Sequence, residues 1–350
     1  LRNAIVDSKV YRLSVLLVFN LILVWSSSIR AAFLRGEFYL ENGVSTQYGR
    51  LGRNSIGVEG YSKLSKETGD WATVALQFRL VHYRNIMMDN RTVMRREWEP
   101  EFHTTYINLK GFFGQLNLKM GHIEIPFGLE SVINTHSVLA PSGAMINLAT
   151  MQDWGFSLNG QLRWFDYEVA LTSGAGMKAN FNPFSYDNGM YLLSARVQPV
   201  LSGDKQVGIS GFFGEMTPTG NHMVRMSPQD RGSDMDLRVE RRIGVDLRSP
   251  IFLLNTAFDW RFEFALGQRN GASVISIDGA IEREFLSSWH GLVGGRLWRH
   301  GDSLPDVWGI LSLGKQISPN LSWEIMFSPD FSETRSANGV SVLSLIYLTH

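Results

Sequence analysis

The feature that most constrains this chain is an alternation of apolar and polar side chains with a period of two residues. It is clearest over 256–267, where the even positions carry Thr, Phe, Trp, Phe, Phe and Leu. The odd positions of this segment carry Ala, Asp, Arg, Glu, Ala and Gly. Because successive side chains of a β-strand point to opposite faces, the pattern predicts a strand with one apolar and one charged face.

The same alternation recurs along the chain and predicts an all-β fold of sixteen strands. Most of these segments span about 9–15 residues, whereas strands of soluble proteins average about 5–6 and membrane-spanning strands about 9–11. An even number of strands is typical of a bacterial single-chain barrel. The expected strands are 33–42, 54–64, 71–83, 97–110, 112–121, 153–164, 166–174, 188–199, 205–215, 236–248, 252–267, 273–286, 289–299, 306–316, 320–328 and 339–349.

The first residues have the composition of a targeting segment. Basic residues precede the apolar stretch 14–25, and small residues follow it at 26–28 and 31–32. This order is typical of a secretory signal peptide, and the apolar stretch is shorter than the roughly 20 residues of a spanning helix. We expect 1–32 to be a signal peptide and 33–350 to be the folded domain. An uncleaved membrane anchor is the alternative.

Export together with long alternating strands predicts a transmembrane antiparallel β-barrel. In lipid every backbone donor and acceptor must be paired within the protein, which a closed barrel achieves. The apolar face then meets lipid and the polar face lines the lumen. The expected location is the outer membrane of a Gram-negative cell, with membrane lipid and lipopolysaccharide around the barrel. A soluble β-sandwich also alternates, with its apolar face turned inward.

The longest expected connection, 122–152, is too long for a plain turn. It contains many apolar residues, which are unfavourable in a fully solvated loop. We therefore expect it to be the third loop of the barrel and to fold inward as a constriction.

Four segments in order resemble the phosphate-selective porin O/P family. The stretch 118–130 reads LKMGHIEIPFGLE and 152–160 reads QDWGFSLNG, and similarity continues over 167–176 and 194–199. The resemblance is clearest over 115–200. It implies a 16-stranded outer-membrane porin with an inward third loop, and a homotrimer as its assembly.

No catalytic constellation is present in the sequence. The chain has 0 cysteines, which excludes disulfides, Cys-ligated zinc and iron–sulfur clusters formed by its own residues. The 8 histidines show no metal-ligand spacing. Lys+Arg and Asp+Glu are both 33, so the basic excess of a nucleic-acid-binding protein is lacking. We expect no enzyme activity, no cofactor, no metal and no nucleic-acid partner.

The functional residues of such a barrel are the polar side chains of its lumen, because charged rings and constrictions set ion preference. We expect a basic wall on consecutive strands that faces carboxylates of the constriction loop. The predicted pore-lining or constriction residues are Lys63, Arg79, Lys110, Lys119, Glu124, Glu130, Asp153, Arg163 and Arg196.

Two functions of different class remain open at this point. The leading hypothesis is an outer-membrane porin that allows passive diffusion of small hydrophilic solutes or ions, with an anion preference. The alternative is a non-conducting structural barrel that houses or binds another envelope protein.

Overall fold

The computed structural model of the chain describes ten segments. They are 29–45, 49–66, 69–85, 98–129, 151–174, 191–216, 238–253, 256–285, 288–331 and 339–349. The predicted signal peptide falls largely on 1–28, outside the described residues, and stays a prediction. Within the described segments no helix has the length and apolar character needed to cross a membrane.

The described chain is built from antiparallel strands and one short 3-10 helix, η1 (Phe112–Gly114). The strands are β1 (Ile29–Ser45), β2 (Gly49–Lys66), β3 (Gly69–Asn85), β4 (Trp98–Phe102), β5 (Thr105–Gly111), β6 (Leu116–Glu124), β7 (Gln152–Gln161), β8 (Phe165–Thr172), β9 (Tyr191–Pro199), β10 (Gln206–Met216), β11 (Arg238–Leu253), β12 (Thr256–Arg269), β13 (Ala272–Phe285), β14 (Trp289–His300), β15 (Asp306–Ser318), β16 (Leu321–Asp330) and β17 (Gly339–Thr349).

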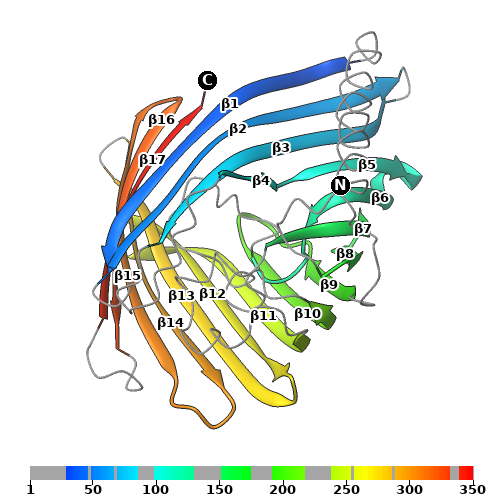
Figure 1. Cartoon of the computed structure of the whole chain (residues 1–350). Coiled ribbons are helices and arrows are strands. Elements are labelled where there is room, and N and C mark those ends of the chain that lie inside the picture. Colours follow the sequence, from blue (N-terminus) through cyan, green and yellow to red (C-terminus); the bar gives the residue numbers. More distant parts are fainter. Residues whose placement is uncertain are drawn as a thin grey trace, which may run out of the picture.

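The strands close into a barrel. Apart from β4 and β5, consecutive strands pair in chain order, and β17 pairs with β1 and closes the barrel in Figure 1. Both β4 and β5 pair with β3, so they are two halves of one interrupted strand and the barrel has 16 strands. The predicted fold class is confirmed, and every predicted strand range overlaps an observed strand.

The break between β4 and β5 is the main local difference from the expected single strand 97–110. Phe78 pairs with Phe102 and Ala75 pairs with Tyr106, so the interrupted strand holds one residue more than β3 across the break. His103 N donates to Gln77 O at 2.9 Å, which keeps the two strands joined there. One extra residue on one strand is a β-bulge, which bends the strand and increases its twist.

The two faces of the barrel wall are inverted relative to a soluble protein. On β11 the outward Val239, Ile243 and Val245 are 43–55% exposed. The inward Glu240 and Asp246 on the same strand are 0–1% exposed. An exterior of large apolar side chains around a charged interior is the arrangement of a membrane barrel. The alternation predicted from the sequence therefore has its apolar face outward.

The connections differ between the two ends of the barrel. At one end the described strands are separated by two to six residues, at 67–68, 112–115, 162–164, 200–205, 254–255, 286–288 and 319–320. The other end holds the long connections 86–97, 125–151, 173–190 and 217–237, together with shorter ones such as 270–271. Short turns mark the periplasmic end of bacterial barrels and long loops the outer end, and we use these two names below.

A charge placed on the outward face tests the inverted wall. Val245→Arg lies at the middle of β11 and should lower the free energy of unfolding by about 2–4 kcal/mol, because arginine is costly at the bilayer midplane. Val239→Arg lies near the end of the same strand on the same face and should cost about 0–1 kcal/mol. Equilibrium urea unfolding in lipid vesicles measures both. Equal losses at the two positions would contradict the lipid-facing assignment of β11.

Candidate functional site

The inner face of the barrel is lined by ion pairs, all but one of which join different strands, the exception being Arg242–Glu240 within β11. Their side chains come from β1–β3, β6, β8, β9 and β11–β14, so the pairs extend around most of the wall. Pairing lowers the cost of holding each charge in a partly dehydrated environment. The pairs are Arg35–Glu59, Arg79–Glu37, Lys119–Glu168, Arg196–Asp246, Arg242–Glu240, Arg269–Glu240, Arg248–Asp259 and Arg296–Asp278.

The pair between Arg79 and Glu37 spans an intervening strand. Arg79 lies on β3 and Glu37 on β1, and Gly57 of β2 is the register partner of both. A Cβ at Gly57 would lie 2.7 Å from the Arg79 Cγ, so only glycine leaves room for this crossing. Gln77 Nε2 and the Tyr347 hydroxyl also donate to Glu37, at 3.0 and 3.2 Å. The cation and the carboxylate are 2% and 1% exposed at their side chains.

The same arrangement recurs across β10. Arg196 of β9 reaches Asp246 of β11 through two contacts, Nε to Oδ2 at 3.1 Å and Nη2 to Oδ1 at 2.5 Å. A Cβ at Gly208 of β10 would lie 2.5 Å from both the Arg196 Nη2 and the Asp246 Oδ2. Two parallel contacts between a guanidinium and a carboxylate fix the orientation of both groups. The contact between Arg196 and Asp246 therefore requires a residue without a side chain at position 208 of the strand between them.

The Lys119 side chain of β6 extends across β7 to reach Glu168 of β8, and the residue of β7 between them is the small Ser157. The Lys119 Nζ lies 2.8 Å from the Glu168 Oε1, and the Ser157 hydroxyl of the strand between them donates to the same oxygen at 2.6 Å. The ammonium also lies 5.3 Å from the centroid of the Tyr106 ring. A cation over a tyrosine face is attracted by the ring quadrupole, so Lys119 is held from two sides.

The remaining predicted site residues are placed differently from one another. Lys63 lies half-buried on the inner face of β2, paired in register with Thr73. Lys110 lies near the periplasmic end, with its Nζ 3.8 Å from the Asp70 Oδ2. The Arg163 guanidinium lies in an exposed turn, 4.7 Å from the Trp164 ring centroid, because β7 ends at Gln161.

The predicted acidic residues that the structure describes also differ in where they lie and in what they contact. Asp153 is buried on β7 and accepts hydrogen bonds from the Ser173 hydroxyl at 2.8 Å and the Gly174 N–H at 2.6 Å. Asp153 therefore fixes the first two residues that follow β8, Ser173 and Gly174. Glu124 accepts a hydrogen bond from the Thr104 hydroxyl at 3.4 Å. Glu130 lies outside the described residues.

Part of the expected basic wall is paired with carboxylates of the wall itself, whereas the expected acidic loop falls largely on 130–150, outside the described residues, so the arrangement of wall and loop stays a prediction. Arg79, Lys119 and Arg196 each contact a carboxylate of the wall itself. A field across the lumen requires positive and negative charges on opposite sides, whereas these charges are neutralised within two strands. The sequence pattern places such residues on the inner face but does not identify their partners.

The chain turns into the barrel directly after β6. Ile125 and Phe127 are 0% and 2% exposed and pack with Leu192, Phe212 and Met216 of the inner wall, among others. The Phe127 and Phe212 rings meet edge to face with centroids 4.8 Å apart. The first part of the expected third loop is therefore folded inward, and its residues 130–150 lie outside the described segments.

Main-chain hydrogen bonds hold this inward segment to the wall. Gly128 N donates to the Ser210 hydroxyl at 3.1 Å, and Leu129 N donates to the Glu263 Oε2 at 3.2 Å. Gly128 has φ +64, and a Cβ there would lie 2.0 Å from the same Glu263 oxygen. A Cβ at Gly244 would lie 3.0 Å from the Phe127 Cζ. Glycine at 128 and 244 therefore allows the segment to approach the wall closely.

Comparison with protein-family models finds no match, and comparison with curated proteins finds none. Solved structures do match. The high-pH structure of OprB from Pseudomonas putida aligns with a TM-score of 0.63 at 11% identity, covering 91% of this chain and 94% of that chain. The anion-selective porin from Comamonas acidovorans aligns with a TM-score of 0.55 at 9% identity, covering 91% and 99%.

A third match is the trimer form of in-vitro folded OmpT from Vibrio cholerae. It aligns with a TM-score of 0.55 at 9% identity, covering 91% of this chain and 99% of that chain. At these identities the likeness shows the fold alone, which is that of bacterial outer-membrane porins. The resemblance to the phosphate-selective porin O/P family is not singled out by these matches and stays a prediction.

Removing the Phe127 ring tests the anchoring of the inward segment. In Phe127→Ala, amide exchange at Gly128 and Leu129 should accelerate by about a hundredfold or more, because truncating a buried phenylalanine costs about 3–5 kcal/mol. Hydrogen–deuterium exchange with mass spectrometry in micelles measures this rate. Phe213→Ala removes the same ring from the outward face of β10 and should leave these amides protected. Equal acceleration in both variants would contradict the anchor.

Proposed function

We propose that this chain is an outer-membrane porin through which small hydrophilic solutes diffuse passively. The observation that carries the proposal is the inverted wall of a closed barrel. Large apolar side chains cover its outside, whereas inward groups such as Arg35 and Glu59 remain 39% and 25% exposed at their side chains within the lumen. A charged interior of this kind is stable when water fills it.

The inward segment 125–129 supports a narrowed path rather than a plain tube. It lies against β10 and β12 through Ser210 and Glu263, on one side of the lumen. A chain segment placed across part of a wide barrel reduces the open cross-section and sets the size of solute that passes. We propose that the wall facing this segment carries the permeation path.

The predicted pore-lining residues belong to this proposal in two groups. Lys63, Arg79 and Lys110 lie on inward positions of β2, β3 and β5 and belong to the proposed path. Lys119 and Arg196 also lie inward, but on β6, which leads into the segment, and on β9, which packs against it. Asp153, Glu124 and Arg163 instead hold local structure or lie in a turn, as described above, and Glu130 belongs to the expected constriction loop.

The expected anion preference is left out of the proposal. It depended on a basic wall, and Arg79, Lys119 and Arg196 are each paired with a carboxylate. Paired charges of opposite sign add little net field in the lumen. Relationship to the phosphate-selective porin O/P family and assembly as a homotrimer remain part of the proposal, supported by the segment resemblance and by the trimeric OmpT among the matching folds.

Channel formation tests the proposed function directly. Purified folded protein added to a planar lipid bilayer should produce stepwise conductance increases. Vesicles that contain the protein should swell in small sugars and stay unchanged in large polymers. Folding is checked independently by heat-dependent mobility on a gel. A folded barrel without conductance would contradict the porin proposal and favour the non-conducting scaffold.

Cysteine substitution tests which face meets the water-filled path. The chain has 0 cysteines, so each introduced thiol is the only one present. Lys110→Cys places a thiol on the inner face of β5, and Leu109→Cys places one on the adjacent outer face. A charged methanethiosulfonate reagent should reduce conductance in the first variant and not in the second, because thiols in lipid do not ionise. The reverse result would contradict the assignment of faces.

A further inference from the structure

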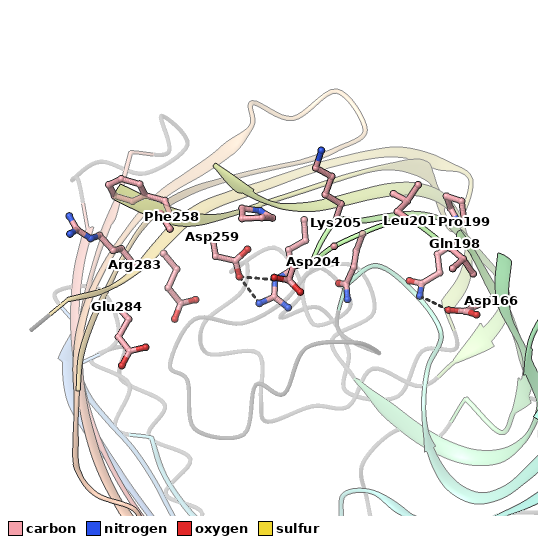
Figure 2. Close-up of a pocket in the computed structure, with 17 residues that line it drawn as sticks. Asp166, Gln198, Pro199, Leu201, Asp204, Lys205, Phe258, Asp259, Arg283 and Glu284 are labelled. Carbon is pink, nitrogen blue, oxygen red and sulfur yellow. Dashed lines mark hydrogen bonds and ion pairs between the residues drawn. The ribbon is translucent and has the colours of Figure 1, made fainter. Parts of the chain in front are cut away.

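The periplasmic end of the barrel contains a cavity of about 630 Å³. It lies against β8–β13 and the turn between β9 and β10, as Figure 2 shows. We call it the acidic vestibule. Its charged inward side chains are Asp166, Asp204, Arg248, Asp259, Glu282 and Glu284.

Acidic side chains of the vestibule point into the cavity, whereas most of its basic side chains point away from it. Figure 2 shows Asp204, Asp259 and Glu284 pointing into the cavity, whereas Lys205 and Arg283 point away from it. The Arg283 guanidinium lies 5.3 Å from the Phe258 ring centroid on the other face of the wall. Strand alternation explains the opposite directions of Arg283 and Glu284, since neighbouring residues of β13 face opposite sides. Two of the three basic residues at the cavity therefore do not face its interior.

The inward basic residue is already neutralised. The Arg248 guanidinium contacts the Asp259 Oδ2 through Nε at 2.7 Å and Nη2 at 2.5 Å. Among the described residues, no ion pair joins Asp204, Glu282 or Glu284 to a basic side chain. The lining holds five inward carboxylates against one inward cation, so its net charge stays negative even with Arg261, the register partner of Arg248 next to the cavity, included.

Two oxygens of the cavity wall also need donors. Asp166 accepts a hydrogen bond at Oδ2 from the Gln198 Nε2 at 3.1 Å, but its Oδ1 accepts none within the described part of the chain. Gln206 Oε1 is likewise shielded from the surface and accepts none there. Both oxygens are buried within the wall, where the water of the cavity does not reach them. A carboxylate oxygen and an amide oxygen that lack donors among the described residues add negative potential to the wall that faces the cavity.

We propose that the acidic vestibule makes the pore prefer cations over anions at its periplasmic mouth. The inference rests on the proposed porin function and adds the solute class. A mouth lined by charges of one sign raises the local concentration of the opposite ion. Because the Debye length grows from about 3 Å at 1 M to about 10 Å at 0.1 M salt, the preference should strengthen at low salt.

The reversal potential of single channels in a KCl gradient tests the inference. The reversal potential of wild-type channels should have the sign that selective K⁺ permeation produces. The permeability ratio of K⁺ to Cl⁻ should be above one, and it should increase at low salt. The triple variant Asp204→Asn, Glu282→Gln and Glu284→Gln should move this ratio at least halfway to one. The control pair Lys205→Gln and Arg283→Gln removes charges that point away and should retain the wild-type sign and the low-salt increase.

The outcomes separate this inference from the porin proposal. Wild-type channels that conduct but prefer Cl⁻ would contradict the proposed role of the vestibule and leave the porin proposal standing. An unchanged permeability ratio in the triple variant would have the same meaning. Channels in which the control pair moves the ratio as far as the triple variant does would also overturn it. A folded barrel without any conductance would overturn the porin proposal, and the vestibule with it.

Discussion

The structure depends first on the pairing of β17 with β1. An open sheet in a membrane leaves the backbone groups of its two edge strands without partners, and each such group costs several kcal/mol in lipid. The pairing from Glu37 with Thr349 to Ser45 with Ser341 removes both edges. Every other feature follows from this closure, since a closed wall separates an outside from an inside.

The inside of the wall must then hold charges without leaving them isolated. The barrel does this with ion pairs, several of which join a cation on one strand to a carboxylate two strands away, with a small residue between them. Gly57 beneath Arg79 and Gly208 beneath Arg196 are two examples. The charges neutralise one another close to the wall, so the predicted cations contribute less to ion preference than their sign suggests. Preference depends instead on places where carboxylates outnumber facing cations, as at the periplasmic mouth.

The sequence alone predicts the barrel well, because the two-residue period is a local property of each strand. Residues 256–267 show both the strand and its outward face, and observed β12 agrees with them. The interruption between β4 and β5 could not be predicted, because a bulge depends on the register with β3. The partners of Arg79 and Arg196 also remained hidden, since they lie two strands away and are brought together by closure. Likewise, an inward third loop was expected from its apolar residues, but its anchors Ser210 and Glu263 depend on the tertiary fold.

The most direct measurement for the closed barrel is a disulfide between its first and last strands. Asn42 and Ser344 are register partners on the outward face of β1 and β17. Paired residues of antiparallel strands have Cα atoms about 4.5–5.5 Å apart, within the range that a disulfide spans. In this chain, which has 0 cysteines, Asn42→Cys with Ser344→Cys should therefore oxidise to a cross-linked product resolved on a non-reducing gel. Asn42→Cys with Leu343→Cys, whose second thiol faces inward, should not. Absence of the cross-link in the first pair, in protein shown to be folded, would contradict the closure.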